Sequence, residues 1–180
     1  MNTKTFEFNG KEYAYFDHPS NQTYANERRV EIPIAFEFVE KYKDILEVGN
    51  VIRHYNREYK HDIIDLYEQS AWPIWNKDIL TWTPKREYPA ILSISTVEHT
   101  SDPVKAVKRI LSFAPKILIT FPVGRNADHL LDADIKAKFY FLKRAHKDNL
   151  WQQIYDIGEV RTIKYNKPYP YGNCIVIISK

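Results

Sequence analysis

Short, nearly continuous apolar runs divide the middle of the chain, and polar residues follow each of them. The runs cover residues 45–48, 63–64, 90–95 and 116–121. Runs of this length indicate strands that are buried on both faces, as in a parallel sheet.

Helical spacing of apolar residues lies between these runs. After Pro33, apolar side chains recur every three or four residues, which predicts an amphipathic helix leading into the first strand. Asp102-Pro103 is a typical pair of cap and first-turn residues, so a second helix is expected from there to Pro115. A third helix is expected over residues 132–146.

The two ends of the chain have strand patterns. Asn9-Gly10 between two alternating runs predicts a hairpin near the start. Residues 160–165 and 174–178 flank a loop rich in Pro, Tyr and Gly, which predicts an antiparallel pair. Alternating strands and helices with this ending predict an α/β fold: a doubly wound sheet of about seven mostly parallel strands with a C-terminal antiparallel hairpin.

The length of 180 residues predicts one domain, with residues 1–43 as a hairpin and helix and residues 44–180 as the core. A single cysteine, Cys174, excludes an internal disulfide and suits a reducing compartment. No apolar run approaches the roughly 20 residues that span a bilayer, and the first residues lack the apolar core of a signal peptide. A cytoplasmic protein without a membrane partner is therefore expected.

The net charge of +3 is small, and lysines are scattered among glutamates. Nucleic-acid binding requires a concentrated basic surface, so this pattern favours a solvated surface and disfavours a nucleic-acid partner. The sequence leaves the oligomeric state open.

Polar residues at the ends of the first two predicted strands point to a ligand site. Glu47 and Gly49 end the first strand, and Asp65 ends the second. Ligands of open α/β sheets bind beyond the carboxyl ends of the strands, where an acidic residue accepts hydrogen bonds from ribose hydroxyls. This arrangement predicts a nucleoside site; a tight turn at Gly49 and a helix cap at Asp65 are the structural alternatives.

Four segments in this order resemble the class I S-adenosylmethionine-dependent methyltransferases, over roughly residues 30 to 180. They correspond to that family's glycine loop, ribose strand, adenine segment and fourth strand with its acidic-His pair. In this chain they are Ile45-Leu46-Glu47-Val48-Gly49, Ile63-Ile64-Asp65, Asn76-Lys77-Asp78-Ile79, and Ile91 to Pro103, the last followed by a strand ending at Phe121-Pro122.

This resemblance implies a Rossmann-like fold, S-adenosylmethionine as cofactor, and methyl transfer to a small-molecule acceptor. The residues it implies for cofactor binding are Glu47, Gly49, Asn50, Asp65, Asp78 and Ser95. His99 is the candidate catalytic base, because imidazole titrates near neutral pH. The alternatives are a turn or cap role for Asp78 and a cap role for Glu98-His99.

The glycine loop departs from the family pattern of two or three alternating glycines. Gly49 is followed by Asn50-Val51-Ile52-Arg53-His54, and the side chains of Asn50 and His54 could replace backbone contacts to the cofactor. The same departure supports an alternative function, a non-catalytic binding or scaffold protein of methyltransferase fold. RNA methylation is a further, less favoured alternative.

Two remaining expectations concern a metal and a lid. Histidines and carboxylates occur without metal-ligand spacing, so no metal site is expected. The tyrosine-rich residues 6–24 are expected to fold over the site near Gly49 and Ser95; the alternative is that their aromatic side chains cover a face of the sheet.

Overall fold

The computed structural model describes residues 4–19, 21, 27–69, 73–123, 128–144, 150–162 and 174–180. Seven strands form one sheet in the order β4-β3-β5-β6-β9-β7-β8. The strands are β3 (Ile45–Val48), β4 (Asp62–Ile64), β5 (Ala90–Ile94), β6 (Lys116–Pro122), β7 (Lys138–Arg144), β8 (Trp151–Ile154) and β9 (Cys174–Ser179).

Most strands of the sheet are parallel, as the sequence predicts. β3 pairs in parallel with β4 and β5, and β5 pairs in parallel with β6. β9 lies antiparallel between β6 and β7, and β8 is antiparallel to β7. The antiparallel pairs are thus confined to the C-terminal half of the sheet.

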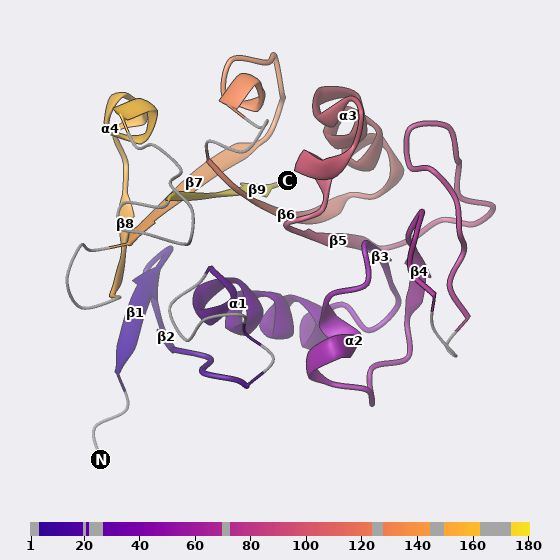
Figure 1. Ribbon diagram of the computed structural model, residues 1–180, viewed down its shortest axis with the longest axis horizontal. Helices are drawn as coiled ribbons and strands as arrows, with labels where there is room; N and C mark the ends of the chain where they lie inside the picture. Colours follow the sequence, from indigo (N-terminus) through magenta and orange to yellow (C-terminus); the bar gives the residue numbers. More distant parts are fainter. Residues whose placement is uncertain are drawn as a thin grey trace.

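Helices cover the sheet on both faces (Figure 1). One face carries α1 (Arg28–Lys41), the short α2 (Ile52–Tyr55) and the hairpin of β1 (Thr5–Phe8) and β2 (Lys11–Ala14); the other carries α3 (Pro103–Phe113), η2 (Asp128–Leu130) and α4 (Ile157–Thr162). Another single turn, η1 (Val97–His99), follows β5.

Alternation along the central strands divides the core into two layers. Leu92 and Ile94 of β5 pack in the cluster that includes the apolar face of α1, whereas Ile91 packs in the cluster that includes α3. Successive side chains of a strand point to opposite faces. Continuous apolar runs are therefore what a sheet covered on both sides requires.

Pro33 lies inside α1 rather than in its first turn, because the helix begins at Arg28, five residues earlier than expected. A proline cannot donate to the carbonyl four residues before it. Here that carbonyl, Arg29 O, accepts a hydrogen bond of 3.0 Å from Phe16 N. The segment after the hairpin therefore compensates for the proline.

The helix predicted over residues 132–146 is wrong. Residues 138–144 form β7, in which Phe139 and Phe141 pack on the α3 side while Tyr140 and Leu142 pack on the α1 side. This alternation is typical of a strand buried on both faces.

The antiparallel pairing at the C-terminus has different members from those predicted. Val160 belongs to α4, so residues 160–162 are helical, and residues 163–165 lie outside the described part of the chain. The antiparallel partners of β9 are β6 and β7.

The N-terminal hairpin covers the sheet at the β8 end. The Phe6 ring stacks on those of Tyr13 and Tyr15, and Trp151 N of β8 donates to the Tyr15 hydroxyl at 2.6 Å. This favours the covering role over the lid for the hairpin itself. Farther along, Phe16 and His18 contact Tyr55 of α2, the helix that follows Gly49.

Candidate functional site

The carboxyl ends of β3, β4, β5 and β6 meet at one edge of the sheet. Gly49 N donates to Ile64 O at 2.9 Å, which joins the loop after β3 to the end of β4. Ser93 Oγ donates to Val48 O at 3.0 Å, and Ser95 N donates to Thr120 O at 2.9 Å. The structure thus brings the loop at Gly49, the end of β4 before Asp65, and Ser95 to the same edge.

Glu47 is fully buried, and groups of the protein itself occupy both of its carboxylate oxygens. Oε1 accepts hydrogen bonds of 2.8 Å from the backbone N–H groups of Val51 and Ile52, and Oε2 accepts one of 2.6 Å from His61 Nε2. These donors compensate for the burial of the carboxylate and cap the start of α2. Its contacts support an indirect role, in which Glu47 shapes the loop after Gly49.

His61 is a site residue that sequence reasoning missed. Its ring is buried against Glu47, directly before β4. No clear signal in the sequence marks it, because His61 stands between two charged residues, Lys60 and Asp62.

Gly49 has a backbone conformation that only glycine adopts easily. Its φ is +89°, and a Cβ at this position would lie 2.2 Å from Thr96 Oγ1 and 3.0 Å from Thr96 Cβ. The turn and the contact with Thr96 explain this glycine without a ligand. It positions the end of β3 against the loop after β5.

Gly49→Ala is expected to lower the free energy of unfolding by about 2 kcal/mol or more, since it adds steric overlap to a left-handed φ. Gly10→Ala is the matched control, because Gly10 has φ +75° and a Cβ added there would meet nothing within 4 Å. Urea unfolding of both variants separates the two contributions. Equal losses would show that contact with Thr96 does not matter.

Asn50 and Asp65 carry acceptors that the described part of the chain leaves unused. Asn50 is only 9% exposed, and its Oδ1 has no hydrogen-bond donor there. Asp65 Oδ1 accepts from Tyr67 N at 2.9 Å and Glu68 N at 2.8 Å, which is the capping role. Its Oδ2 makes no hydrogen bond within the described residues and can accept one from a ligand.

Asp78 lies farther from the glycine loop. A parallel bridge between Ile64 and Trp75 places this segment on the outer side of β4, away from β3. Asp78 Oδ1 accepts from Leu80 N at 2.8 Å and so caps a turn. This is the turn role that the sequence left open, and a ligand contact by Asp78 stays a prediction.

Ser95 is held by the helix that precedes β3. Its Oγ donates to Glu31 Oε1 at 2.8 Å, and Arg28 Nη1 lies 3.0 Å from Glu31 Oε2. Glu31 is fully buried, and Ser95 has a φ of +41°, which is rare for a residue other than glycine. Glu31 and Arg28 were missed from the sequence, where they fit the pattern of an amphipathic helix.

Glu98 and His99 have different environments. The Glu98 side chain is 1% exposed, and within the described residues neither of its oxygens has a hydrogen-bond donor. Burial raises the pKa of Glu98 to about 8, and Glu31 adds to that effect while Arg28 opposes it. His99 is 57% exposed, with Nε2 3.7 Å from Glu98 Oε1. Its role as a base stays a prediction.

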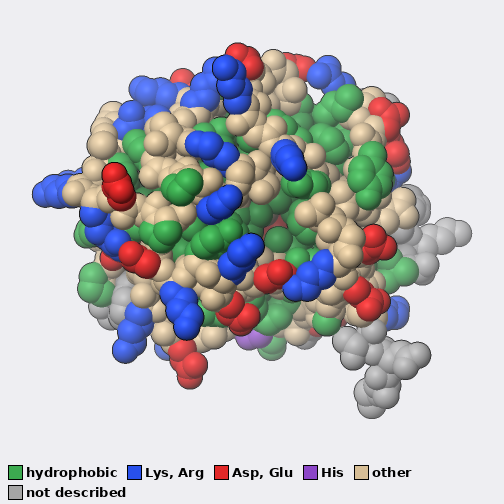
Figure 2. Space-filling model, turned by 180° about the vertical axis from the view of Figure 1, so that it is seen from behind, with side chains coloured by type: hydrophobic (Ala, Val, Ile, Leu, Met, Phe, Trp, Pro, Cys, Tyr) green, Lys and Arg blue, Asp and Glu red, His purple; other side chains and the backbone are tan. Residues whose placement is uncertain are grey.

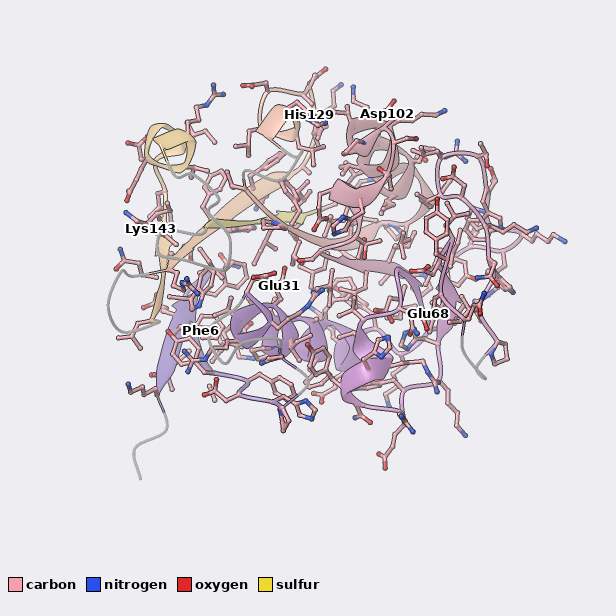
Figure 3. All side chains as sticks on the ribbon, in the orientation of Figure 1. Phe6, Glu31, Glu68, Asp102, His129 and Lys143 are labelled. Carbon is pink, nitrogen blue, oxygen red and sulfur yellow. The ribbon has the colours of Figure 1, made fainter. Side chains whose placement is uncertain are left out.

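His54 lies on α2, and its contact there is with Glu68. The His54 side chain is exposed, and its Nε2 lies 3.6 Å from Oε2 of Glu68, the residue labelled in Figure 3. Among the described residues, no group of three His, Cys, Asp or Glu side chains is placed to hold a metal ion.

No helix in the described ranges is long and apolar enough to cross a membrane.

Comparisons with known proteins identify the fold but give no match by sequence. No family model matches the chain, and no curated protein matches it significantly. A solved S-adenosylmethionine-dependent methyltransferase from Thermotoga maritima, described as a possible histamine N-methyltransferase, is 12% identical with a TM-score of 0.50. The match covers 76% of this chain and 82% of that one.

The N-methyltransferase NodS from Bradyrhizobium japonicum, solved with S-adenosylhomocysteine, is also similar. It is 9% identical, with a TM-score of 0.47, over 87% of this chain and 93% of that one. At these identities the similarity concerns the fold. The chain has the Rossmann-like fold of the class I S-adenosylmethionine-dependent methyltransferases, and the resemblance noted in the sequence is confirmed at that level.

Proposed function

We propose that the chain binds S-adenosylmethionine at the carboxyl edge of β3, β4 and β5 and transfers its methyl group to a small-molecule acceptor. The observation that carries this proposal is the pair of unused acceptors at the ends of two adjacent parallel strands. These are Asn50 Oδ1 after β3 and Asp65 Oδ2 after β4. An acidic residue in this position suits ribose hydroxyls, and the fold supports the same assignment.

The residues present fit this cofactor. Asp65 would hold the ribose, and Asn50 would accept a hydrogen bond from the cofactor at the loop that Glu47 and Gly49 shape. When bound, the cofactor supplies a methyl group on a positively charged sulfur, which makes that methyl electrophilic. The chain then has to orient the acceptor for in-line attack and exclude water.

A small acceptor is favoured over a nucleic acid. Lys and Arg side chains lie among Asp and Glu side chains on the face shown in Figure 2. The net charge of the whole chain is only +3. A nucleic-acid substrate would require a concentrated basic surface around the site.

The alternative of a non-catalytic binding or scaffold protein rests on the loop after Gly49. Val51 and Ile52 use their N–H groups to bind Glu47, and α2 begins at once. These two donors are therefore not available to a ligand. Titration with S-adenosylmethionine and S-adenosylhomocysteine by calorimetry decides between the two functions: no heat and no thermal shift at millimolar ligand would exclude the enzyme.

Asp65→Asn is expected to weaken S-adenosylhomocysteine binding about tenfold or more, because an amide donor replaces the oxygen that would accept from the ribose. The amide oxygen can keep the capping bonds to Tyr67 and Glu68, so the melting temperature should change little. Asp156→Asn is the control, since Asp156 Oδ1 caps Gly158 N at 2.8 Å beside α4. Unchanged affinity in Asp65→Asn would contradict the proposed ribose site.

A further inference from the structure

His61 is hydrogen-bonded to the carboxylate that supports the loop after Gly49. The residue lies directly before β4, and its side chain is 2% exposed. Nε2 donates to Glu47 Oε2 at 2.6 Å, and Nδ1 has no hydrogen-bond partner among the described residues. In the described part of the chain, Glu47 is thus the one hydrogen-bond partner of the imidazole ring.

The Glu47 carboxylate gathers donors from two separate segments. Oε1 accepts hydrogen bonds of 2.8 Å from the backbone N–H groups of Val51 and Ile52, while Oε2 accepts from His61. Asn50, the proposed cofactor contact, lies in the turn that this carboxylate closes. The bond from His61 prevents the carboxylate from rotating, so Oε1 stays against the two N–H groups.

The same bond connects the two strands that lead to the proposed cofactor contacts. At one end, His61 and Glu47 link the start of β4 to β3. At the other end, Gly49 N donates to Ile64 O at 2.9 Å. The positions of the loop after β3 and of the end of β4 therefore depend on each other.

Stability alone does not explain a buried pair of this kind. Taking a carboxylate and an imidazole out of water is costly, and apolar residues of similar volume are often at least as stabilising. His61 also lines a cavity of about 290 Å³, whose other walls come from residues 39–43 and 59–60. Asn50 and Asp65 are not among its lining residues, so His61 reaches the candidate cofactor site through Glu47.

We propose that His61 is a positioning residue for the cofactor, because its bond to Glu47 fixes the loop that carries Asn50 against the end of β4. Resting on the proposed function, this inference assigns part of the affinity for S-adenosylmethionine to a residue that does not touch it. Without the bond, the carboxylate rotates and the loop takes up several positions. Cofactor binding must then order the loop, which costs free energy.

Two amide variants separate this role from simple packing. The amide nitrogen of His61→Gln lies about as far from the backbone as Nε2 does, whereas that of His61→Asn ends near the place of Nδ1. Only glutamine can therefore donate to Glu47. Calorimetry with S-adenosylhomocysteine is expected to show binding about tenfold weaker in His61→Asn, and affinity within about threefold of the unmodified protein in His61→Gln.

Hydrogen exchange of the free protein tests the loop without a cofactor. In His61→Asn, the amide protons of Val51 and Ile52 are expected to exchange about tenfold faster relative to those of β5, and His61→Gln should keep the ratio of the unmodified protein. A variant that is only less stable would accelerate the amides of β5 as well. In the unmodified protein, nitrogen NMR of the ring should find the proton of His61 on Nε2; a proton on Nδ1 alone would contradict the inference.

His129→Asn is the matched control, because His129 is exposed and belongs to η2 on the other face of the sheet (Figure 3). Unchanged affinity in His61→Asn, equal losses in His61→Asn and His61→Gln, or an unchanged exchange ratio would each overturn the inference. If the unmodified protein itself binds no S-adenosylhomocysteine at millimolar concentration, the methyltransferase function is wrong. The exchange ratio then decides by itself whether His61 holds the loop.

Discussion

Glu47→Ala is expected to lower the free energy of unfolding by about 4 kcal/mol. The change removes the acceptor of three donors at once: Val51 N, Ile52 N and His61 Nε2. Each buried donor that is left without an acceptor costs about 1–3 kcal/mol, and three donors lose their acceptor here. Urea unfolding followed by circular dichroism at pH 7 measures the loss.

Glu58→Ala is the control for this prediction, because Glu58 is an exposed glutamate shortly after α2. Glu47→Gln should fall between the two. Its amide oxygen can still accept from Val51 and Ile52, but the charge on the bond to His61 is gone. A loss below about 1 kcal/mol in Glu47→Ala would contradict the capping role.

The parallel half of the sheet could be predicted because its strands follow from local sequence. Residues 45–48 and 90–94 are mostly apolar and too short for buried helices, and the structure pairs them in parallel. β7 could not be predicted in the same way. Phe139 and Leu142 fit helical spacing as well, and the choice is made by pairing with β9, which lies about 35 residues farther along the chain.

The same distinction applies to the candidate site. Gly49, Asp65 and Ser95 follow apolar runs. Parallel pairing of the strands therefore places all three at the same edge of the sheet. The direction of the Glu47 carboxylate depends instead on the backbone N–H groups of Val51 and Ile52 at the start of α2. The role of Glu31 could not be predicted from the sequence for a similar reason, because its hydrogen bond with Ser95 joins residues 64 positions apart.

Glu98→Gln is expected to stabilise the protein at alkaline pH. Burial raises the pKa of Glu98 from 4.5 to about 8, so between these values the folded protein binds more protons than the unfolded chain. The contribution of Glu98 to the free energy of unfolding is therefore complete below about pH 4.5, decreases as the pH rises to about 8, and is constant above it. Glutamine stays neutral throughout, so the variant lacks this decrease.

The difference between the two proteins should grow from near zero at about pH 4 to about 4 kcal/mol at about pH 8.5, as the free energies of unfolding in urea would show. Glu7→Gln, whose side chain is exposed, should follow the unmodified protein at every pH. Parallel curves for Glu98→Gln and the unmodified protein would mean that the Glu98 carboxyl ionises near its usual pH.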